Sequence, residues 1–128
     1  MIMEVFRIVR EKYADKLIAT GAANRWNREG DYVIYAGSSR SLATLELVVH
    51  KSSIKPVLAY KVMVITITDS DHVVTCINQK DLPRNWRSVA AYLALQKTGS
   101  DWYETKSTLL LKVPSAVIPR EFNYIINS

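Results

Sequence analysis

The strongest strand signal in the chain is VLAYKVMVITIT, residues Val57 to Thr68. It is rich in β-branched and aromatic side chains, and it is long enough to bend across a small sheet. A turn, Asp69-Ser70-Asp71, follows it, and the next short strand, Val73 to Ile77, is expected to pair with it as a hairpin. This part of the chain predicts a sheet as the core of the fold.

Helices and further strands are expected on both sides of this hairpin. A serine of the turn Gly37-Ser38-Ser39 is the expected N-cap of the first helix, and the second helix is expected to begin after Asn85 and to end at Gly99. Because strands and helices are mixed without regular βαβ alternation, the predicted class is α+β, with mixed or antiparallel sheets and short helices. The expected elements, in chain order, are a strand over Met3–Val9, a short turn or helix over Glu11–Leu17, a loop over Thr20–Asp31, a buried strand over Tyr32–Ala36, a helix over Arg40–His50, a helix over Trp86–Lys97, a strand over Thr108–Val113 and a short strand over Asn123–Ile126.

Length and composition predict one compact domain over residues 1–128. The chain is 48% hydrophobic and 23% charged, which is typical of a globular domain, and its length suffices to bury roughly two-thirds of the surface that an unfolded chain exposes. No apolar run approaches the roughly 20 residues of a membrane helix, and the N-terminus lacks a signal-peptide pattern. The single cysteine, Cys76, excludes an internal disulfide and fits a reducing cytoplasm, so a cytoplasmic location without a membrane is expected.

Metal and nucleotide motifs are absent from the sequence. The four glycines form neither a dinucleotide fingerprint nor a P-loop, and there is no nucleophile elbow. Asp69, Asp71, His72 and Cys76 lie close together, but on a hairpin turn they favour a solvated bend over a metal site. Cys76 is interpreted as a buried strand residue, and no metal is expected.

The net charge of +5 is concentrated in the first half of the chain. Residues 1–64 hold ten Lys and Arg against six Asp and Glu, whereas residues 65–128 hold seven against six. Lys16, Arg25 and Arg28 occur in one stretch without an acidic residue. Two interpretations stay open, a solvated surface or an anion site near the loop that carries Arg25.

Glu46 is the most unusual placement in the sequence. At about 100° per residue, Leu42, Leu45 and Val49 form one apolar stripe of the first helix, and Glu46 falls on its edge. Since the neighbouring positions make most of this helix apolar, the helix is expected to be buried and Glu46 to point into protein or a cleft. A structural ion pair with an Arg and a functional carboxylate are both consistent with this position.

Three further residues carry two interpretations each. Arg25, next to Trp26 in the loop, suits either a cation–π clasp on the surface or a phosphate grip beside a stacking platform. Tyr35 ends a buried strand and suits core packing or a half-exposed ring. Ser115, between Pro114 and Pro119, suits a plain turn or a binding role.

Taken together, these segments resemble the RES domain, the toxin half of RES–Xre toxin–antitoxin pairs, which is named for its Arg, Glu and Ser. Each segment is weakly diagnostic alone, but their order and spacing over nearly the whole chain are specific. The matching segments are Val5-Phe6-Arg7, Gly21–Asn27 with Gly30, Val33–Ala36, Ser41–Glu46, Leu82-Pro83 with Trp86, Gly99 with Trp102, Val113–Pro119 and Asn123–Asn127.

The resemblance implies an ADP-ribosyltransferase-like α+β fold that acts on NAD. Such toxins hydrolyse or phosphorolyse NAD, and some are reported to ADP-ribosylate a protein; the implied partners are an Xre-type helix-turn-helix antitoxin, NAD and inorganic phosphate, without membrane or direct nucleic-acid binding. The implied catalytic residues are Glu46, Arg25 and Ser115, and the implied NAD-binding residues are Arg7, Arg25, Tyr35, Ser39 and Ser115. Two departures stand out: Ala22-Ala23-Asn24 replaces a glycine-rich approach to the arginine, and the chain ends at Ser128, where relatives usually continue.

The implied chemistry agrees with a single carboxylate. Cleavage of the nicotinamide–ribose bond passes through an oxocarbenium-like transition state, as glycoside hydrolysis does. Nicotinamide departs as a neutral ring, so no general acid is needed, and Glu46 would stabilise the developing positive charge. Arg25 would bind pyrophosphate or an attacking phosphate, Tyr35 would stack on a ring, and Ser115 would donate a hydrogen bond to ribose or amide.

Two other functions fit the small, basic chain. One is a toxin acting on RNA, or a nucleic-acid-binding module, whose expected mark is a basic face interleaved with exposed aromatic residues. The other is a catalytically silent fragment that only binds an antitoxin. Nicotinamide release from NAD, or RNA cleavage, distinguishes the three.

Overall fold

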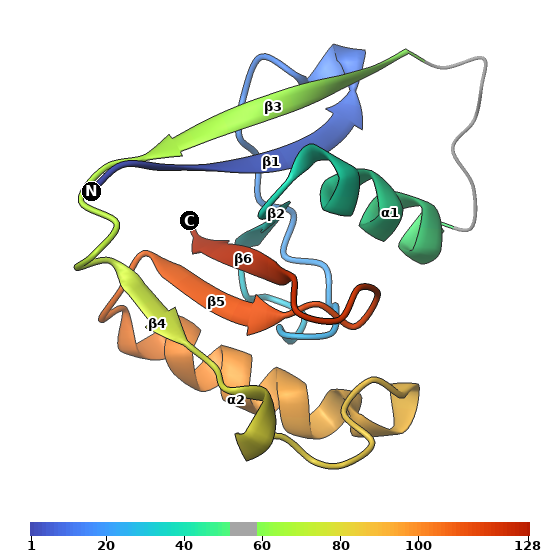
Figure 1. Ribbon diagram of the computed structural model, residues 1–128, viewed down its shortest axis with the longest axis vertical. Coiled ribbons are helices and arrows are strands. Elements are labelled where there is room, and N and C mark those ends of the chain that lie inside the picture. Colours follow the sequence, from blue (N-terminus) through green and yellow to red (C-terminus); the bar gives the residue numbers. More distant parts are fainter. Residues whose placement is uncertain (52–58) are drawn as a thin grey trace.

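The computed structural model describes residues 1–51 and 59–128 and has six strands in one mixed sheet, with two α-helices packed on it (Figure 1). In the described part of the chain, the strand order is β3-β1-β2-β6-β5-β4. The strands are β1 (Met3–Arg10), β2 (Val33–Gly37), β3 (Tyr60–Ile67), β4 (Val74–Cys76), β5 (Leu110–Pro114) and β6 (Phe122–Asn127), and the helices are α1 (Arg40–Lys51) and α2 (Tyr92–Thr105). Short 3₁₀ turns span Glu11–Tyr13, Gln79–Asp81 and Val89–Ala91.

The sheet is divided between β1 and β2. β1 pairs with β3 along eight residues, but its pairing with β2 is recorded at one position, Phe6 with Gly37. The pair β1–β3 folds over the other strands, so that Val5 and Ile67 are buried together with Ile34 and Ile126. The two parts of the sheet therefore meet at one point and separate beyond it (Figure 1).

The alternation of side chains in the strands supplies two apolar clusters. Residues of β2, β5 and β6 that point to one face pack against β1–β3, and their immediate neighbours point to the other face, toward α2. The second cluster contains the three tryptophans Trp26, Trp86 and Trp102, together with Leu95 of α2. The loop that carries Trp26 is thus part of the core.

The prediction that residues 57–68 and 73–77 pair with each other as a hairpin is wrong. β3 pairs antiparallel with β1, while β4 pairs parallel with β5, with Val74 opposite Leu110. Residues 52–58, which include Val57, lie outside the described residues. Since both strands have suitable β-propensity, the sequence could not distinguish a local hairpin from two partners far away in the chain.

The second helix also differs from the expectation. It begins at Tyr92 instead of Trp86, and it continues through Gly99 to Thr105, where Lys106 adopts a left-handed conformation with φ of 53°. Gly99 is a site of close packing and not a helix stop, because a Cβ there would lie 1.6 Å from the carbonyl oxygen of Trp26. The helical turns beyond Gly99 carry Trp102, which packs in the core.

The first helix is only half-buried, which corrects the expected all-round burial. Leu42 and Ala43 are buried, but Leu45 is 42% exposed and Val49 is 56% exposed. The buried face therefore does not coincide with the predicted stripe. Glu46 lies between the two faces, half-buried.

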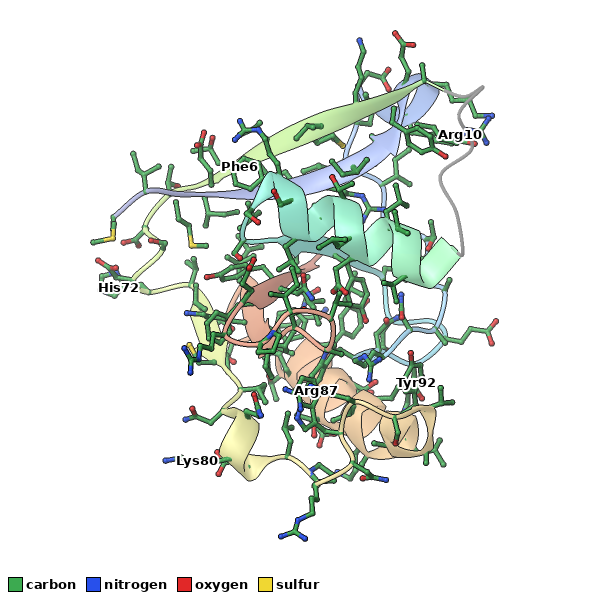
Figure 2. The ribbon with its side chains drawn as sticks, turned by 45° about the vertical axis from the view of Figure 1, so that its right-hand side comes forward. Phe6, Arg10, His72, Lys80, Arg87 and Tyr92 are labelled. Atoms are coloured by element: carbon green, nitrogen blue, oxygen red, sulfur yellow. The ribbon has the colours of Figure 1, made fainter. Side chains whose placement is uncertain are left out.

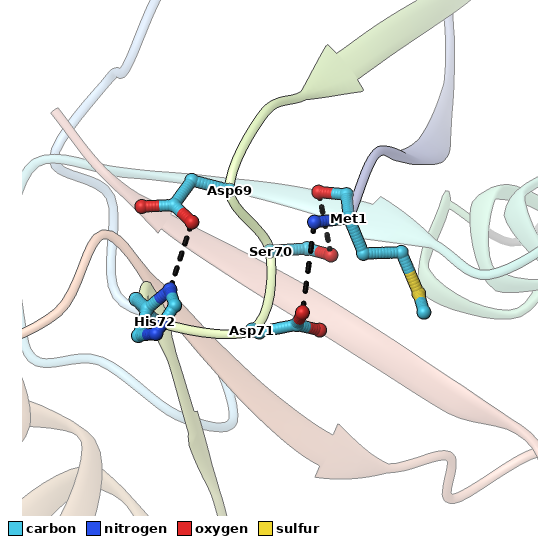
Figure 3. A network of polar contacts seen from close by, with 5 residues as sticks. All are labelled: Met1, Asp69, Ser70, Asp71 and His72. Atoms are coloured by element: carbon cyan, nitrogen blue, oxygen red, sulfur yellow. Dashed lines mark hydrogen bonds and ion pairs between the residues drawn. The ribbon is translucent and has the colours of Figure 1, made fainter.

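The segment Asp69–His72 ties the N-terminus to the end of β3 (Figure 3). The backbone N–H of Ser70 donates to the Met1 carbonyl at 2.9 Å, and the Met1 ammonium lies 3.6 Å from Asp71. His72 contacts Asp69 at 2.8 Å on the surface. Cys76 lies on strand β4 as expected, but it is exposed and not buried.

Candidate active site

A cavity of about 360 Å³ lies where β1 and β2 separate, beside α1. Its wall also includes Ile18, Thr20 and the start of the loop that follows. This volume lies within the range of small-molecule sites. The polar side chains on its wall are Arg7, Thr20, Asn24, Tyr35, Glu46 and Asn123.

The start of α1 places Glu46 over this cavity. Ser39 is the N-cap, since its Oγ accepts the backbone N–H of Leu42 at 3.0 Å. Gly37 lets the first turn approach β2, because a Cβ there would lie 3.0 Å from the backbone nitrogen of Ala43. One turn after Leu42, Glu46 reaches the cavity wall and its Oε2 accepts a hydrogen bond from Nδ2 of Asn123.

Arg7 supplies a fixed positive charge to the cavity wall. Its Nη1 donates to the backbone carbonyl of Tyr35 at 2.8 Å across the separation of β1 and β2. Burial lowers the pKa of Arg7 below its usual value, but a guanidinium remains protonated at neutral pH. The cavity therefore has an anion-binding group on β1 and a carboxylate on α1.

Tyr35 connects the cavity to the loop over residues 20–31. Its hydroxyl donates to Oδ1 of Asn27 at 2.6 Å and accepts the backbone N–H of Trp26 at 3.1 Å. Burial raises the pKa of Tyr35 well above 10.0, and the hydrogen bond from Trp26 opposes this effect without cancelling it. The phenol is consequently neutral at physiological pH, and its ring forms part of the cavity wall.

One side chain of the same loop closes the loop on itself, and another holds it against α2. Nδ2 of Asn27, which is almost fully buried, donates to the carbonyl of Ala22 at 2.8 Å. Asp31 accepts a short hydrogen bond from the hydroxyl of Ser100 on α2. The loop is therefore anchored on both sides, with Ala22, Ala23 and Asn24 left on the cavity wall.

Arg25 points away from the cavity in this structure. Its Nη1 donates to the carbonyls of Trp86 and Arg87, each at 3.1 Å, and its guanidinium lies 4.8 Å from the centre of the Tyr92 ring. Figure 2 shows Arg87 and Tyr92 near the start of α2. Arg25 thus makes a cation–π contact, but with Tyr92 and not with Trp26, which is buried in the core. The phosphate-binding role of Arg25 stays a prediction.

Ser115 and Ser39 serve local structure. Ser115 is 2% exposed, and its Oγ accepts the backbone N–H groups of Val117 and Ile118 at 3.0 and 3.1 Å. Ser39 caps α1. The structure thus brings Arg7, Tyr35 and Glu46 together on one cavity wall, and it places Arg25, Ser39 and Ser115 off that wall.

Asn123 is the main polar residue of the wall that reasoning from the sequence missed. It is 9% exposed on β6 and donates to Glu46, 77 positions earlier in the chain. The signal that could have found it is a polar amide at the start of an otherwise apolar strand, Asn123–Ile126. Asn24, beside Arg25, is the second such residue.

The described residues include no group of three or more His, Cys, Asp and Glu side chains that could hold a metal ion. None of the described helices is long and apolar enough to cross a bilayer.

The charged groups of the cavity wall indicate what kind of ligand it suits. Among the described residues of the wall, Glu46 supplies the one carboxylate, and Arg7 supplies a positive charge. The cavity is thus suited to a ligand with an anionic part, near Arg7, and a part that develops positive charge, near Glu46.

The chain is similar in sequence to a known domain family and to several known proteins. The sequence model of the RES domain matches residues 4–128. A protein named Toxin Res from Yersinia enterocolitica is 36% identical over 129 residues, which is 98% of this chain and 84% of that protein. A Prs ADP-ribosylating toxin from a Sphingobium species is 39% identical over 121 residues, 89% of this chain and 73% of that protein.

A solved structure shares the fold. A chain in the crystal structure of the M. tuberculosis MbcT–MbcA toxin–antitoxin complex superposes with a TM-score of 0.77 at 17% identity, over 98% of this chain and 74% of that chain. The expected α+β fold is thereby confirmed.

Proposed function

The chain belongs to the RES domain family, and from that premise we propose that it is the toxin of a toxin–antitoxin pair that cleaves the nicotinamide–ribose bond of NAD. The observation that carries the proposal is that one carboxylate, Glu46, and one cation, Arg7, line the same cavity of about 360 Å³. The ADP-ribosylating toxin among the relatives supports NAD as the substrate.

Departure of nicotinamide needs no general acid from the protein. Breaking the bond transfers its electron pair to nicotinamide, which leaves as a neutral ring, while positive charge develops on the ribose. A carboxylate fixed beside the ribose stabilises that charge, and no proton has to be delivered to the leaving group. Glu46, on a helix and hydrogen-bonded to Asn123, meets this requirement.

The other roles follow from the positions on the wall. Arg7 binds an anionic part of the substrate, and the Tyr35 ring packs against the nicotinamide or the ribose. Arg25 would bind the pyrophosphate after exchanging its carbonyl contacts for phosphate oxygens, which are stronger acceptors for a guanidinium. Ser39 and Ser115 would contribute through the turns that they hold, beside α1 and β5.

After nicotinamide has left, an acceptor forms a new bond to C1′ of the ribose. Water, phosphate or a protein side chain would give hydrolysis, phosphorolysis or ADP-ribosyl transfer. An antitoxin of the Xre helix-turn-helix type is the proposed partner, in line with the toxin–antitoxin complex formed by the protein of similar fold. The proposed site of action is the cytoplasm, where NAD is abundant.

The decisive experiment measures nicotinamide release from NAD by the purified protein, with and without inorganic phosphate. Glu46→Gln keeps the shape and the hydrogen-bond acceptor but removes the charge, and we expect release to fall by about 100-fold or more. Glu104→Gln is the matched control, because Glu104 is an exposed carboxylate on α2.

The outcome that contradicts the proposal is turnover in Glu46→Gln at the rate of the Glu104→Gln control. Absence of release in the wild-type protein together with RNA cleavage would identify a nuclease instead. Absence of both activities would identify a chain that only binds its antitoxin.

A further inference from the structure

We infer that Asn123 is a positioning residue that holds the carboxylate of Glu46 in its working orientation. The inference rests on the proposed function for its catalytic consequence, but the contact itself is a property of the free protein. Nδ2 of Asn123 donates to Oε2 of Glu46, and both side chains lie on the cavity wall.

The backbone of Asn123 is fixed from both sides. It lies in β6, in the interior of the sheet, paired with Gly37 of β2 on one side and with Val113 of β5 on the other. An interior strand cannot shift without breaking hydrogen bonds on both flanks. The backbone that carries the Asn123 side chain is therefore held in place on both sides, whereas α1 contacts the sheet on one side only.

Gly37 leaves the space in which the two side chains meet. Residues opposite each other in an antiparallel pair project to the same face, about 5 Å apart. Gly37 adds no side chain next to Asn123, and the first turn of α1 occupies the space that a Cβ would fill. The carboxylate of Glu46 then reaches Asn123 directly.

A neutral donor suits the proposed chemistry better than a cation does. An Arg or Lys partner would also orient a carboxylate, but its charge would offset the negative charge that the developing oxocarbenium ion requires. An amide N–H fixes one carboxylate oxygen without adding a charge of its own. Arg7, the cation of the cavity wall, donates to the carbonyl of Tyr35.

The contact can be tested without any activity. We expect the NMR signals of the Asn123 side-chain amide at pH 7 to move in Glu46→Gln and to stay in place in the control Glu104→Gln. An Asn123 signal that is unchanged in Glu46→Gln, or that moves equally in both variants, would overturn the inference even if the enzyme is active.

The catalytic consequence is tested with Asn123→Ala. We expect kcat for nicotinamide release to fall by about 10- to 100-fold, because a carboxylate that has lost this hydrogen bond is misplaced by about 1 Å, while KM for NAD changes little. Asn127→Ala is the matched control on the same strand, since its Nδ2 donates to the carbonyl of Tyr103 and it is absent from the cavity wall.

The possible results separate the two proposals. Equal losses in Asn123→Ala and Asn127→Ala, or a loss confined to KM, would overturn the positioning role. If the wild-type protein releases no nicotinamide, the proposed function fails, and the NMR comparison of the wild type with Glu46→Gln still decides the contact. If Asn123→Ala does not fold, the comparison of wild type with Glu46→Gln decides it, because that pair leaves Asn123 in place.

Discussion

The hydroxyl of Tyr35 joins the cavity wall to the loop over residues 20–31. It donates to Asn27 and accepts from the backbone of Trp26, so both loop groups depend on one phenol. Reasoning from the sequence placed Tyr35, Glu46 and Arg7 among the site residues, and these three do line one cavity. Their positions could be predicted because each lies at a recognisable place in a strand or helix of a known family pattern.

Tyr35→Phe tests the hydroxyl at the scale of one residue. At pH 8 we expect the free energy of unfolding to fall by about 1–3 kcal/mol, because Oδ1 of Asn27 and the N–H of Trp26 lose a buried partner. Urea denaturation followed by tryptophan fluorescence measures it. An unchanged midpoint would show that water replaces the hydroxyl at no cost.

The same residue predicts a dependence of stability on high pH. Burial raises the pKa of Tyr35 in the folded protein above 10.0, its ordinary value, which applies to the unfolded chain. At a pH between these two pKa values, the unfolded chain therefore binds fewer protons than the folded protein does. The stabilisation is complete below pH 10 and is lost as pH rises through the folded pKa. Between pH 10 and 11, wild type should lose up to about 1.4 kcal/mol more than Tyr35→Phe does; equal slopes would contradict this. The pKa of Tyr124 is also raised, but that contribution is common to both proteins.

At the scale of elements, α2 shows where local signals mislead. Gly99 has the sequence signature of a helix end, but its function is to let the helix touch the backbone of Trp26. Helix α1 shows the opposite case, since its start after Ser39 was predicted from capping chemistry alone. A helix cap can be recognised from neighbouring residues, whereas the close approach of Gly99 to Trp26 joins residues more than 70 positions apart.

Gly99→Ala tests this packing, because the clash is expected to lower the free energy of unfolding whereas helix propensity alone would raise it. Alanine in a helix interior favours folding by about 1 kcal/mol relative to glycine. Here we expect a net loss of about 1–3 kcal/mol or more, because the new Cβ would overlap the Trp26 carbonyl and push the loop away from α2. Thermal and urea unfolding measure it.

Lys97→Ala is the control for this prediction. Lys97 is an exposed residue of the same helix whose Nζ lies 2.9 Å from Asp101, and surface changes of this kind stay within about 0.5 kcal/mol. A stabilised Gly99→Ala protein would contradict the proposed packing.

At the scale of the whole molecule, the cavity exists because one sheet separates into two parts. β1 and β2 meet at Phe6 and Gly37 and diverge beyond them, and Arg7 spans the opening to the carbonyl of Tyr35. The loop over residues 20–31 closes one side of it, held by α2. The site therefore depends on three elements that have no common local signal.

Filling the cavity entrance tests whether this space is the substrate site. Ala23 is exposed and lies on the cavity wall, so Ala23→Trp should block the cavity while leaving the fold stable. We expect binding of NAD, measured by calorimetry, to weaken by about 10-fold or more, since a drug-sized ligand loses buried surface that it needs. Ala94→Trp, at an exposed position of α2 that is not on the cavity wall, is the control. Equal binding by both variants would place the substrate elsewhere.

The amino-acid sequence was enough to predict the α+β class, the places of most strands and a serine cap for the first helix, and it named Arg7, Tyr35 and Glu46, which the structure places on one cavity wall. These predictions follow from side-chain alternation, capping and family spacing, which can be recognised within a few residues. Four features emerge only in the folded chain: the pairing of β4 with β5, the place of Gly99 inside α2, the contacts of Arg25 with Trp86 and Arg87, and the hydrogen bond from Asn123 to Glu46. The physical reason is that each of these rests on contacts between distant segments, whose energies depend on how the whole chain packs and leave no periodic trace in the sequence.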